Sequence, residues 1–163
     1  MDLETFMRQL AMKTINQTSA GGIVFKKVHP NTYPLTPNPY LWLICQHSQH
    51  RGWVFPKGFV GDKVKNEKNE TAALREVEEE GGVKAKIITN LPILPIKTNY
   101  EYEWKNILIK KTVYYFLMEY ISGDPKNHDW EMMDAKFVSE EEVKNTLTYD
   151  SDKQAFEKIL KVL

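Results

Sequence analysis

The hydrophobic pattern of this chain predicts β-strands separated by irregular segments. β-Branched and aromatic residues are dense, or alternate with polar ones, in six stretches: residues 19–28, 40–46, 83–89, 100–104, 107–120 and 135–138. The fourth and fifth stretches are close enough in sequence to form a hairpin. Residues 91–96 are interrupted by Pro92 and Pro95, so an irregular connection is expected there.

Helical spacing predicts four helices, at residues 3–12, 71–80, 140–146 and from about 150 to the C-terminus. Asn69 or Thr71 is the expected N-cap of the second helix, and Gly82 can end it in a left-handed conformation. Ser139 and Glu142 form a capping box for the third. The buried stripe of the fourth is Ala155, Phe156, Ile159, Leu160 and Leu163. Because strands and helices do not alternate regularly, we predict an α+β fold with a mixed sheet.

Two segments carry open alternatives. Residues 28–39 contain four prolines and are predicted to be an irregular loop, which could shape access to a site or be a passive insertion. The amphipathic helix at residues 3–12 could dock on the domain or fray, as chain ends commonly do, or it could contact a partner or a second copy.

Composition narrows the class of protein. A chain of 163 residues with 42% hydrophobic and 27% charged residues is ordinary for a single globular domain. Its formal net charge is zero, so no overall field attracts nucleic acid or an anionic membrane. The only cysteine, Cys45, lies in an apolar run, which predicts a core position and excludes an intrachain disulfide. Without a membrane-length apolar stretch or a signal-peptide pattern, we predict a cytoplasmic protein.

Candidate chemistry is concentrated in the helix predicted at residues 71–80. Glu76, Glu79 and Glu80 are spaced i, i+3 and i+4, which places all three on one face. These like charges repel in a bare helix, but hard oxygen ligands suit Mg²⁺, or Mn²⁺ as a substitute. Arg75 can clamp a carboxylate bidentately. The alternative is a solvated glutamate-rich face, the usual meaning of a charge run.

The whole constellation resembles the Nudix box, whose pattern is G-x5-E-x7-R-E-U-x-E-E-x-G-U with U aliphatic. The strict spacing is met at nine positions over 23 residues: Gly61, Glu67, Arg75, Glu76, Val77, Glu79, Glu80, Gly82 and Val83. In family members the box glycine follows Pro-Lys directly, as Gly58 does here. Either Gly61 is the box glycine, or Gly58 is and the loop to Glu67 carries three extra residues. We favour the second interpretation.

The resemblance extends beyond the box, over residues 18–162. Residues 20–25 look like the family's first core strand. Residues 53–58 resemble the entry to the box in members that hydrolyse diadenosine polyphosphates and diphosphoinositol phosphates. Residues 111–117 resemble a late strand of diadenosine tetraphosphate hydrolases, and Glu131 lies where those enzymes carry a further glutamate near the metals. This resemblance implies a Nudix-type α/β/α sandwich with a mixed sheet for residues 18–163, preceded by an N-terminal extension at residues 1–17.

The same resemblance implies site residues for a Mg²⁺-dependent (or Mn²⁺-dependent) hydrolase of phosphoanhydride bonds. The implied metal ligands are Glu76, Glu79, Glu80 and, directly or through water, Glu67. The implied catalytic residues are Glu79 or Glu131 as general base, with Arg75 holding a carboxylate. The substrate-binding candidates are Lys57, Gly58, Lys111, Tyr102 and Arg51. Arg51 is a weaker candidate, since an exposed arginine is more often an ordinary surface residue, and Tyr102 could stack on a base or simply pack across strands.

Among possible substrates, we favour dinucleoside polyphosphates. The protein is predicted to be a monomer or homodimer. Oxidised nucleoside triphosphates, RNA 5′ ends and diphosphoinositol phosphates remain alternatives within the family. A non-catalytic binding module is a further alternative, but such modules typically lose box glutamates, and here every one is present.

Overall fold

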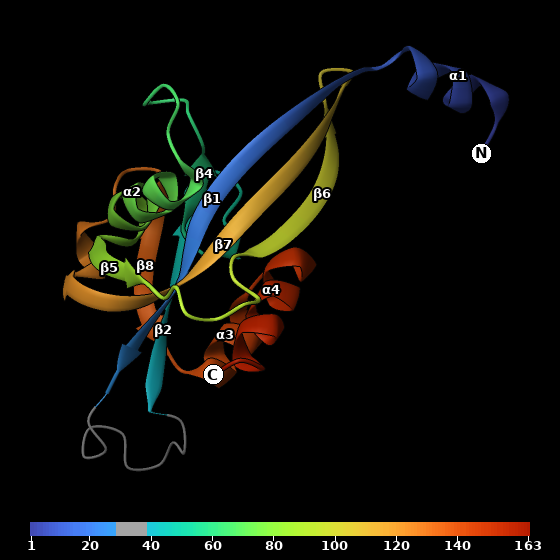
Figure 1. The fold of residues 1–163 in the computed structure, drawn as a ribbon. Helices are drawn as coiled ribbons and strands as arrows, with labels where there is room; N and C mark the ends of the chain where they lie inside the picture. Colours follow the sequence, from blue (N-terminus) through green and yellow to red (C-terminus); the bar gives the residue numbers. More distant parts are fainter. Residues whose placement is uncertain (29–38) are drawn as a thin grey trace.

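A computed structural model describes residues 1–28 and 39–163 and contains one mixed β-sheet (Figure 1). The strands in order along the sheet are β3-β2-β1-β7-β5, with β4 paired to β1, β6 to β7 and β8 to β2. Their bounds are β1 Lys13–Lys27, β2 Tyr40–His47, β3 Trp53–Val54, β4 Lys57–Phe59, β5 Val83–Ile87, β6 Ile96–Trp104, β7 Ile107–Gly123 and β8 Met132–Val138.

Strands β1 and β7 form the centre of the sheet and are its parallel pair. Their register runs from Lys13 opposite Ile107 to Phe25 opposite Glu119, whereas the other pairings are antiparallel. Alternating side chains of these long strands enter opposite faces, so one sheet supports two separate cores. The predicted mixed sheet and the hairpin of β6 and β7 are both confirmed.

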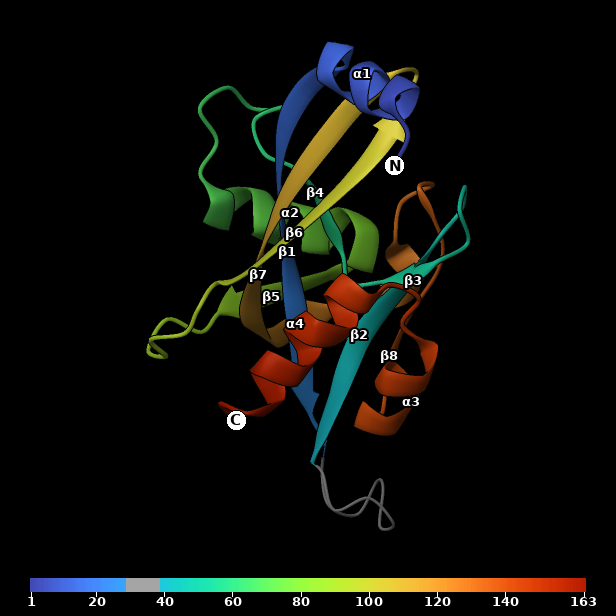
Figure 2. The ribbon, with the colours of Figure 1, turned by 90° about the vertical axis from the view of Figure 1, so that its right-hand side faces the viewer.

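Helices cover the two faces of the sheet. Helix α2 (Asn69–Gly81) packs on one face, and α3 (Glu140–Thr146) and α4 (Asp150–Leu160) pack on the other (Figures 1 and 2). Beneath α2, the apolar contacts come from Ala73 and Val77 against Val24 and Met118. The predicted α/β/α sandwich is therefore confirmed.

The core under α3 and α4 is dominated by aromatic side chains. Phe156 of α4 meets Trp42 edge-on, with ring centroids 5.0 Å apart, and is 1% exposed. The same helix contributes one buried polar contact, in which the Tyr115 hydroxyl donates to the Asp152 carboxylate over 2.6 Å. The predicted stripe holds for Ala155 and Ile159, but Leu163 is 50% exposed because the helix ends three residues earlier.

Helix α1 (Leu3–Ala11) lies at the far end of β1, away from the two helical layers (Figure 1). The Asp2 side chain caps it by accepting the Thr5 N–H over 2.8 Å. None of its residues is buried, so its apolar face is not docked on the described part of the chain. Strand β1 begins at Lys13 and runs without interruption past residue 18.

Four local predictions meet different outcomes. Helix α2 starts at Asn69, two residues before the predicted range. Its N-cap residue is Lys68, which makes no side-chain capping bond, so the predicted cap at Asn69 or Thr71 was wrong. Gly82 does end the helix with φ +70°, and Ser139 accepts the Glu142 N–H as predicted. Most of the predicted 28–39 loop, residues 29–38, lies outside the described residues. The two residues that flank this segment are hydrogen-bonded, since the Val28 N–H donates to the Pro39 carbonyl.

None of the helices in the described part of the chain is long and apolar enough to cross a lipid bilayer.

Candidate active site

The predicted carboxylate face of α2 lies against the short strand β4. Gly58 of β4 faces Glu76 so closely that a Cβ atom at this position would collide with the carboxyl group. Gly61 stands instead at the start of the following loop, with φ +83° and open space around it. Gly58 is therefore the glycine that lets the backbone approach a box glutamate closely, whereas Gly61 is the glycine that adopts a left-handed backbone conformation.

Arg75 organises the acidic side chains around it. Its guanidinium clamps Glu67 with two bonds, Nε to Oε2 at 2.9 Å and Nη2 to Oε1 at 3.0 Å. The same group reaches Glu76 at 2.7 Å, Glu79 at 3.3 Å and the Phe59 carbonyl at 3.2 Å. Such a planar fork fixes orientation as well as charge.

Glu67 serves this clamp with both of its oxygens. Oε1 also accepts the Gly61 N–H over 3.3 Å, and the bond to Arg75 lowers the pKa of the carboxyl. Its predicted part as a metal ligand, directly or through water, stays a prediction. In the structure its oxygens are engaged by protein donors, so its observed part is to hold Arg75.

Glu76 and Glu80 are each 4% exposed, an unusual environment for carboxylates. Burial raises the pKa of Glu80 to about 9, and the nearby charges of Glu76 and Glu131 add to the effect. Among the described residues, Glu80 receives the Lys57 backbone N–H at 3.0 Å but forms no ion pair. Glu76 and Glu80 are therefore two neighbouring buried carboxyl groups, which a bound cation or a proton would stabilise.

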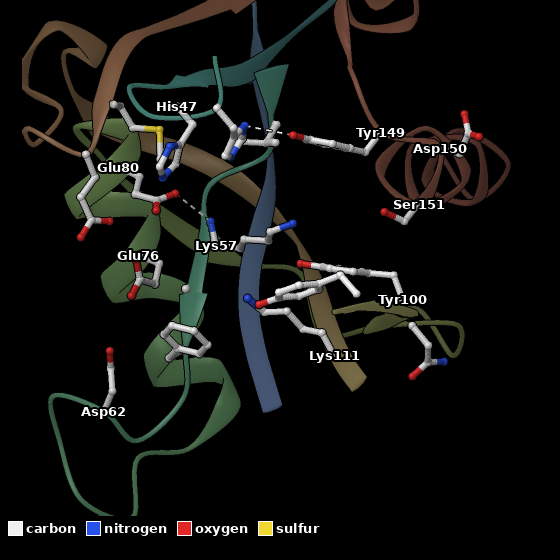
Figure 3. A pocket seen from close by; sticks show the side chains of 18 of the residues that line it. His47, Lys57, Asp62, Glu76, Glu80, Tyr100, Lys111, Tyr149, Asp150 and Ser151 are labelled. Atoms are coloured by element: carbon white, nitrogen blue, oxygen red, sulfur yellow. Dashed lines mark hydrogen bonds between the residues drawn. The ribbon is translucent and has the colours of Figure 1, made fainter. Parts of the chain in front are cut away.

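A cavity of about 890 Å³ opens beside these carboxylates (Figure 3). Glu76 and Glu80 line it on one side, and Lys57, Lys111 and Tyr100 line it on another. Glu131 is also among the lining residues. The Lys57 ammonium lies 5.4 Å from the centre of the Tyr100 ring, and the Lys111 ammonium lies 4.4 Å from that of Phe59. Burial, together with the charge of Lys57, lowers the pKa of Lys111 to about 8.

Tyr100 and Tyr102 present neighbouring rings in this cavity wall, with centroids 6.2 Å apart and planes inclined by 25°. Trp104, two residues after Tyr102 in β6, is 56% exposed and does not line the cavity. Two stacked rings beside two lysines give the cavity both a flat apolar surface and positive charge. This combination suits a base or another ring joined to phosphate.

Two stacked histidines form a further part of the wall, and no sequence pattern placed them together. The rings of His47 and His50 lie 4.2 Å apart and nearly parallel. The Gln49 N–H donates to His47 Nδ1, and the Gly52 N–H donates to His50 Nδ1, so each neutral ring carries its proton on Nε2. Burial lowers the pKa of His50, which favours this neutral form.

The opposite wall comes from the start of α4. Tyr149 donates its hydroxyl to His50 Nδ1 over 3.0 Å, and the following turn adds Asp150, Ser151 and Gln154 to the lining (Figure 3). Because His50 and Tyr149 are separated by 99 positions, only the fold brings them together. Arg51, by contrast, lies in the turn after β2, is exposed, and is not among the lining residues.

The carboxylates of α2 are of the ligand type that binds a hard divalent cation, although they do not form a complete coordination sphere. Within residues 1–28 and 39–163, no three histidine, cysteine, aspartate or glutamate side chains are gathered closely enough to hold a metal ion. Glu76, Glu79 and Glu80 nevertheless project from one helix face as carboxylates, the ligand type that Mg²⁺ and Mn²⁺ prefer. In the structure Glu79 is occupied by the Lys63 ammonium at 2.6 Å.

Comparison with known proteins supports the family resemblance seen in the sequence. The model of the NUDIX domain matches residues 31–159. The protein MutT4 of Mycobacterium tuberculosis is 26% identical over 149 residues, which are 90% of this chain and 55% of that protein. The chain thus spans about half the length of this curated relative.

Two solved structures share the fold. An Ap4A hydrolase of Caenorhabditis elegans, in a binary complex, superimposes with a TM-score of 0.62 at 20% identity, covering 90% of this chain and 96% of that one. The NUDIX domain of Shewanella oneidensis NrtR, in complex with ADP ribose, gives a TM-score of 0.61 at 17% identity and 99% coverage of both chains. Because the family model covers most of the sequence and the fold agrees, this chain belongs to the Nudix domain family.

Proposed function

We propose that this protein is a Mg²⁺-dependent pyrophosphohydrolase that cleaves a phosphoanhydride bond in a substrate containing a linked nucleoside diphosphate. The observation that carries the proposal is the buried pair Glu76 and Glu80, which opens on a cavity that also holds Lys57 and Lys111. One side of this cavity suits a divalent cation, and the other suits the phosphates that such a cation accompanies.

The proposed roles follow from these positions. Glu76, Glu79 and Glu80 would hold the metal, which when bound lowers the pKa of water and neutralises phosphate oxygens. Arg75 holds Glu76 and Glu79 in place, and Lys57 and Lys111 bind phosphates that do not react.

In the proposed reaction, water attacks phosphorus, the bond to the leaving phosphate oxygen breaks, and a carboxylate takes the proton from water. We favour Glu131 over Glu79 for that proton. Glu131 lines the cavity without an ion pair among the described residues, whereas Glu79 is bound by Lys63 and Arg75.

Our preferred substrates are diadenosine tetraphosphate and related dinucleoside polyphosphates. The cavity of about 890 Å³ is within the range of sites that hold nucleotide-sized ligands, and the stacked Tyr100 and Tyr102 can face a base. The likeness to an Ap4A hydrolase agrees with this choice. We further propose a small-molecule substrate rather than nucleic acid, a monomer or homodimer, and a cytoplasmic location.

Product analysis tests the proposed function. Purified protein with Mg²⁺ and diadenosine tetraphosphate is expected to release ATP and AMP, and chelation with EDTA should stop the reaction. Parallel assays with ADP ribose, oxidised nucleoside triphosphates, triphosphorylated RNA ends and diphosphoinositol phosphates would identify another substrate. Absence of metal-dependent turnover across the whole panel would refute the enzymatic proposal and favour a binding module.

The lowered pKa of Lys111 predicts an alkaline limit to activity. Below pH 8 the side chain is mostly protonated and can bind phosphate; above it the charge is lost, so kcat/KM should fall with a midpoint near the Lys111 pKa of about 8. Lys111→Gln should lower kcat/KM at neutral pH by about ten- to a hundredfold, the cost of one charged hydrogen bond. Initial rates at low substrate from pH 6 to 10 check this, and an unchanged alkaline limb in the variant would contradict it.

A further inference from the structure

Lys63 places a cation of the protein's own on a box carboxylate. Its ammonium lies 2.6 Å from Oε2 of Glu79, and Lys63 lines the cavity together with Glu76 and Glu80. The side chains of Lys63 and Glu79 are 49% and 30% exposed, so the contact is open to ions from solvent. Its short distance is typical of a charge-assisted hydrogen bond.

The loop that carries Lys63 is fixed at both ends. The Gly61 N–H donates to Glu67 Oε1 over 3.3 Å, and Arg75 donates to the Phe59 carbonyl before the loop over 3.2 Å. At the other end, the Glu67 N–H donates to the Val64 carbonyl over 3.3 Å. Lys63 therefore stands on a short segment held by the same arginine–glutamate pair that orders the box carboxylates.

This loop is also where the chain departs from the Nudix pattern. Gly58 makes the close approach to Glu76, and eight residues separate it from Glu67, whereas the box pattern allows five between glycine and glutamate. Lys63 lies in this loop, at a position that the box pattern leaves unspecified whichever glycine is the box glycine. The lysine is thus a feature of this chain's loop rather than one of the box positions.

We propose that Lys63 is a tethered counter-cation that competes with divalent metal for Glu79 and so sets the metal concentration at which the site fills. This inference rests on the proposed function, since it takes Glu79 to be a metal ligand. The ammonium contacts Oε2 of Glu79 at 2.6 Å and places a positive charge beside the position that a metal on this carboxylate would take, so the lysine contact and metal binding oppose each other. Anything that stabilises the lysine contact should therefore weaken metal binding, and bound metal should in turn weaken the lysine contact.

The test measures metal binding directly, without substrate. Mn²⁺ is titrated into metal-free protein and its free concentration is followed by electron paramagnetic resonance at fixed ionic strength. Lys63→Gln should bind Mn²⁺ about three- to tenfold more tightly than wild type, because an ion pair and a nearby repulsive charge are both removed. Lys63→Arg keeps the charge and should stay close to wild type.

Lys65→Gln is the matched control, because it removes the same charge from the same loop. Among the described residues Lys65 makes no ion pair with the carboxylates of α2, and its substitution should change the Mn²⁺ affinity less than twofold. Equal effects of the two glutamine variants would overturn the inference and leave only a diffuse charge effect. Unchanged or weaker binding by Lys63→Gln would also overturn it, while leaving the metal site intact. Failure of wild type and all variants to bind Mn²⁺ would instead remove the metal site itself, and the proposed function with it.

Discussion

Replacing Glu80 with glutamine is expected to lower kcat/KM by about a hundred- to a thousandfold, the scale seen when one preorganised electrostatic partner is lost from an active site. The amide keeps the size of the side chain and an oxygen that can accept the Lys57 N–H, now 3.0 Å from Oε2. It removes the negative charge that we propose binds the metal. Initial rates with Mg²⁺ and diadenosine tetraphosphate, or with whichever substrate the panel identifies, measure the loss.

The same substitution should not destabilise the metal-free protein, and this separates a functional residue from a structural one. The folded-state pKa of Glu80 is raised to about 9, above its ordinary value of 4.5. Its contribution to stability is therefore fully present below pH 4.5 and is lost progressively as the pH rises toward 9. In EDTA the wild type should lose stability across this window, and Glu80→Gln should lose less.

Urea unfolding at pH 5.5 and 8.5 compares these slopes, with Glu78→Gln as a matched control on the same helix. Glu78 is exposed, so its substitution should leave both kcat/KM and the pH dependence of stability close to wild type. An active Glu80→Gln protein would remove Glu80 from the metal site. A variant that is inactive because it is unfolded would show equally low stability at both pH values.

Local sequence signals were sufficient for the box helix and its carboxylate face. The spacing of Glu76, Glu79 and Glu80 is a property of a single helix, so no tertiary information was needed to place them together. The start of α2 was less predictable, because packing on the sheet holds its first turn without a side-chain cap at Lys68. Strand β1 likewise begins six residues before the predicted range, since pairing with β7 imposes an extended backbone on polar residues.

The parts of the site that the sequence analysis missed depend on contacts between distant segments. His50 meets Tyr149 across 99 positions, and neither residue belongs to a pattern that predicts the other. Arg51 was a reasonable candidate by charge and proximity in sequence, but its turn leaves it outside the cavity lining. The place of Glu67 in the box predicts a metal ligand, which stays a prediction, whereas its bidentate contact with Arg75 emerges only from the geometry.

Arg75→Lys is expected to lower kcat/KM by about a hundredfold even though it keeps the positive charge. Losses of this size are common when a residue that orients metal ligands is replaced. A lysine has a single donor atom at the end of its side chain, whereas Arg75 contacts Glu67, Glu76 and Glu79 at once. Some of those carboxylates would then repel one another without a fixed partner. We also expect a loss of about 1–3 kcal/mol in the free energy of unfolding, because one charged contact is removed from a partly buried network.

The Mg²⁺ dependence shows how Arg75 acts. If it positions metal ligands, Arg75→Lys should need several-fold more Mg²⁺ for half-maximal rate, and saturating Mg²⁺ should restore part of the activity. A purely structural arginine would lower the amount of folded protein without moving the Mg²⁺ midpoint. Arg8→Lys is the control, because Arg8 contacts Asn106 over 3.1 Å at the far end of the molecule and should change neither quantity. An Arg75→Lys enzyme with wild-type rate and Mg²⁺ midpoint would mean that charge alone suffices and that the guanidinium fork has no part in ordering the site.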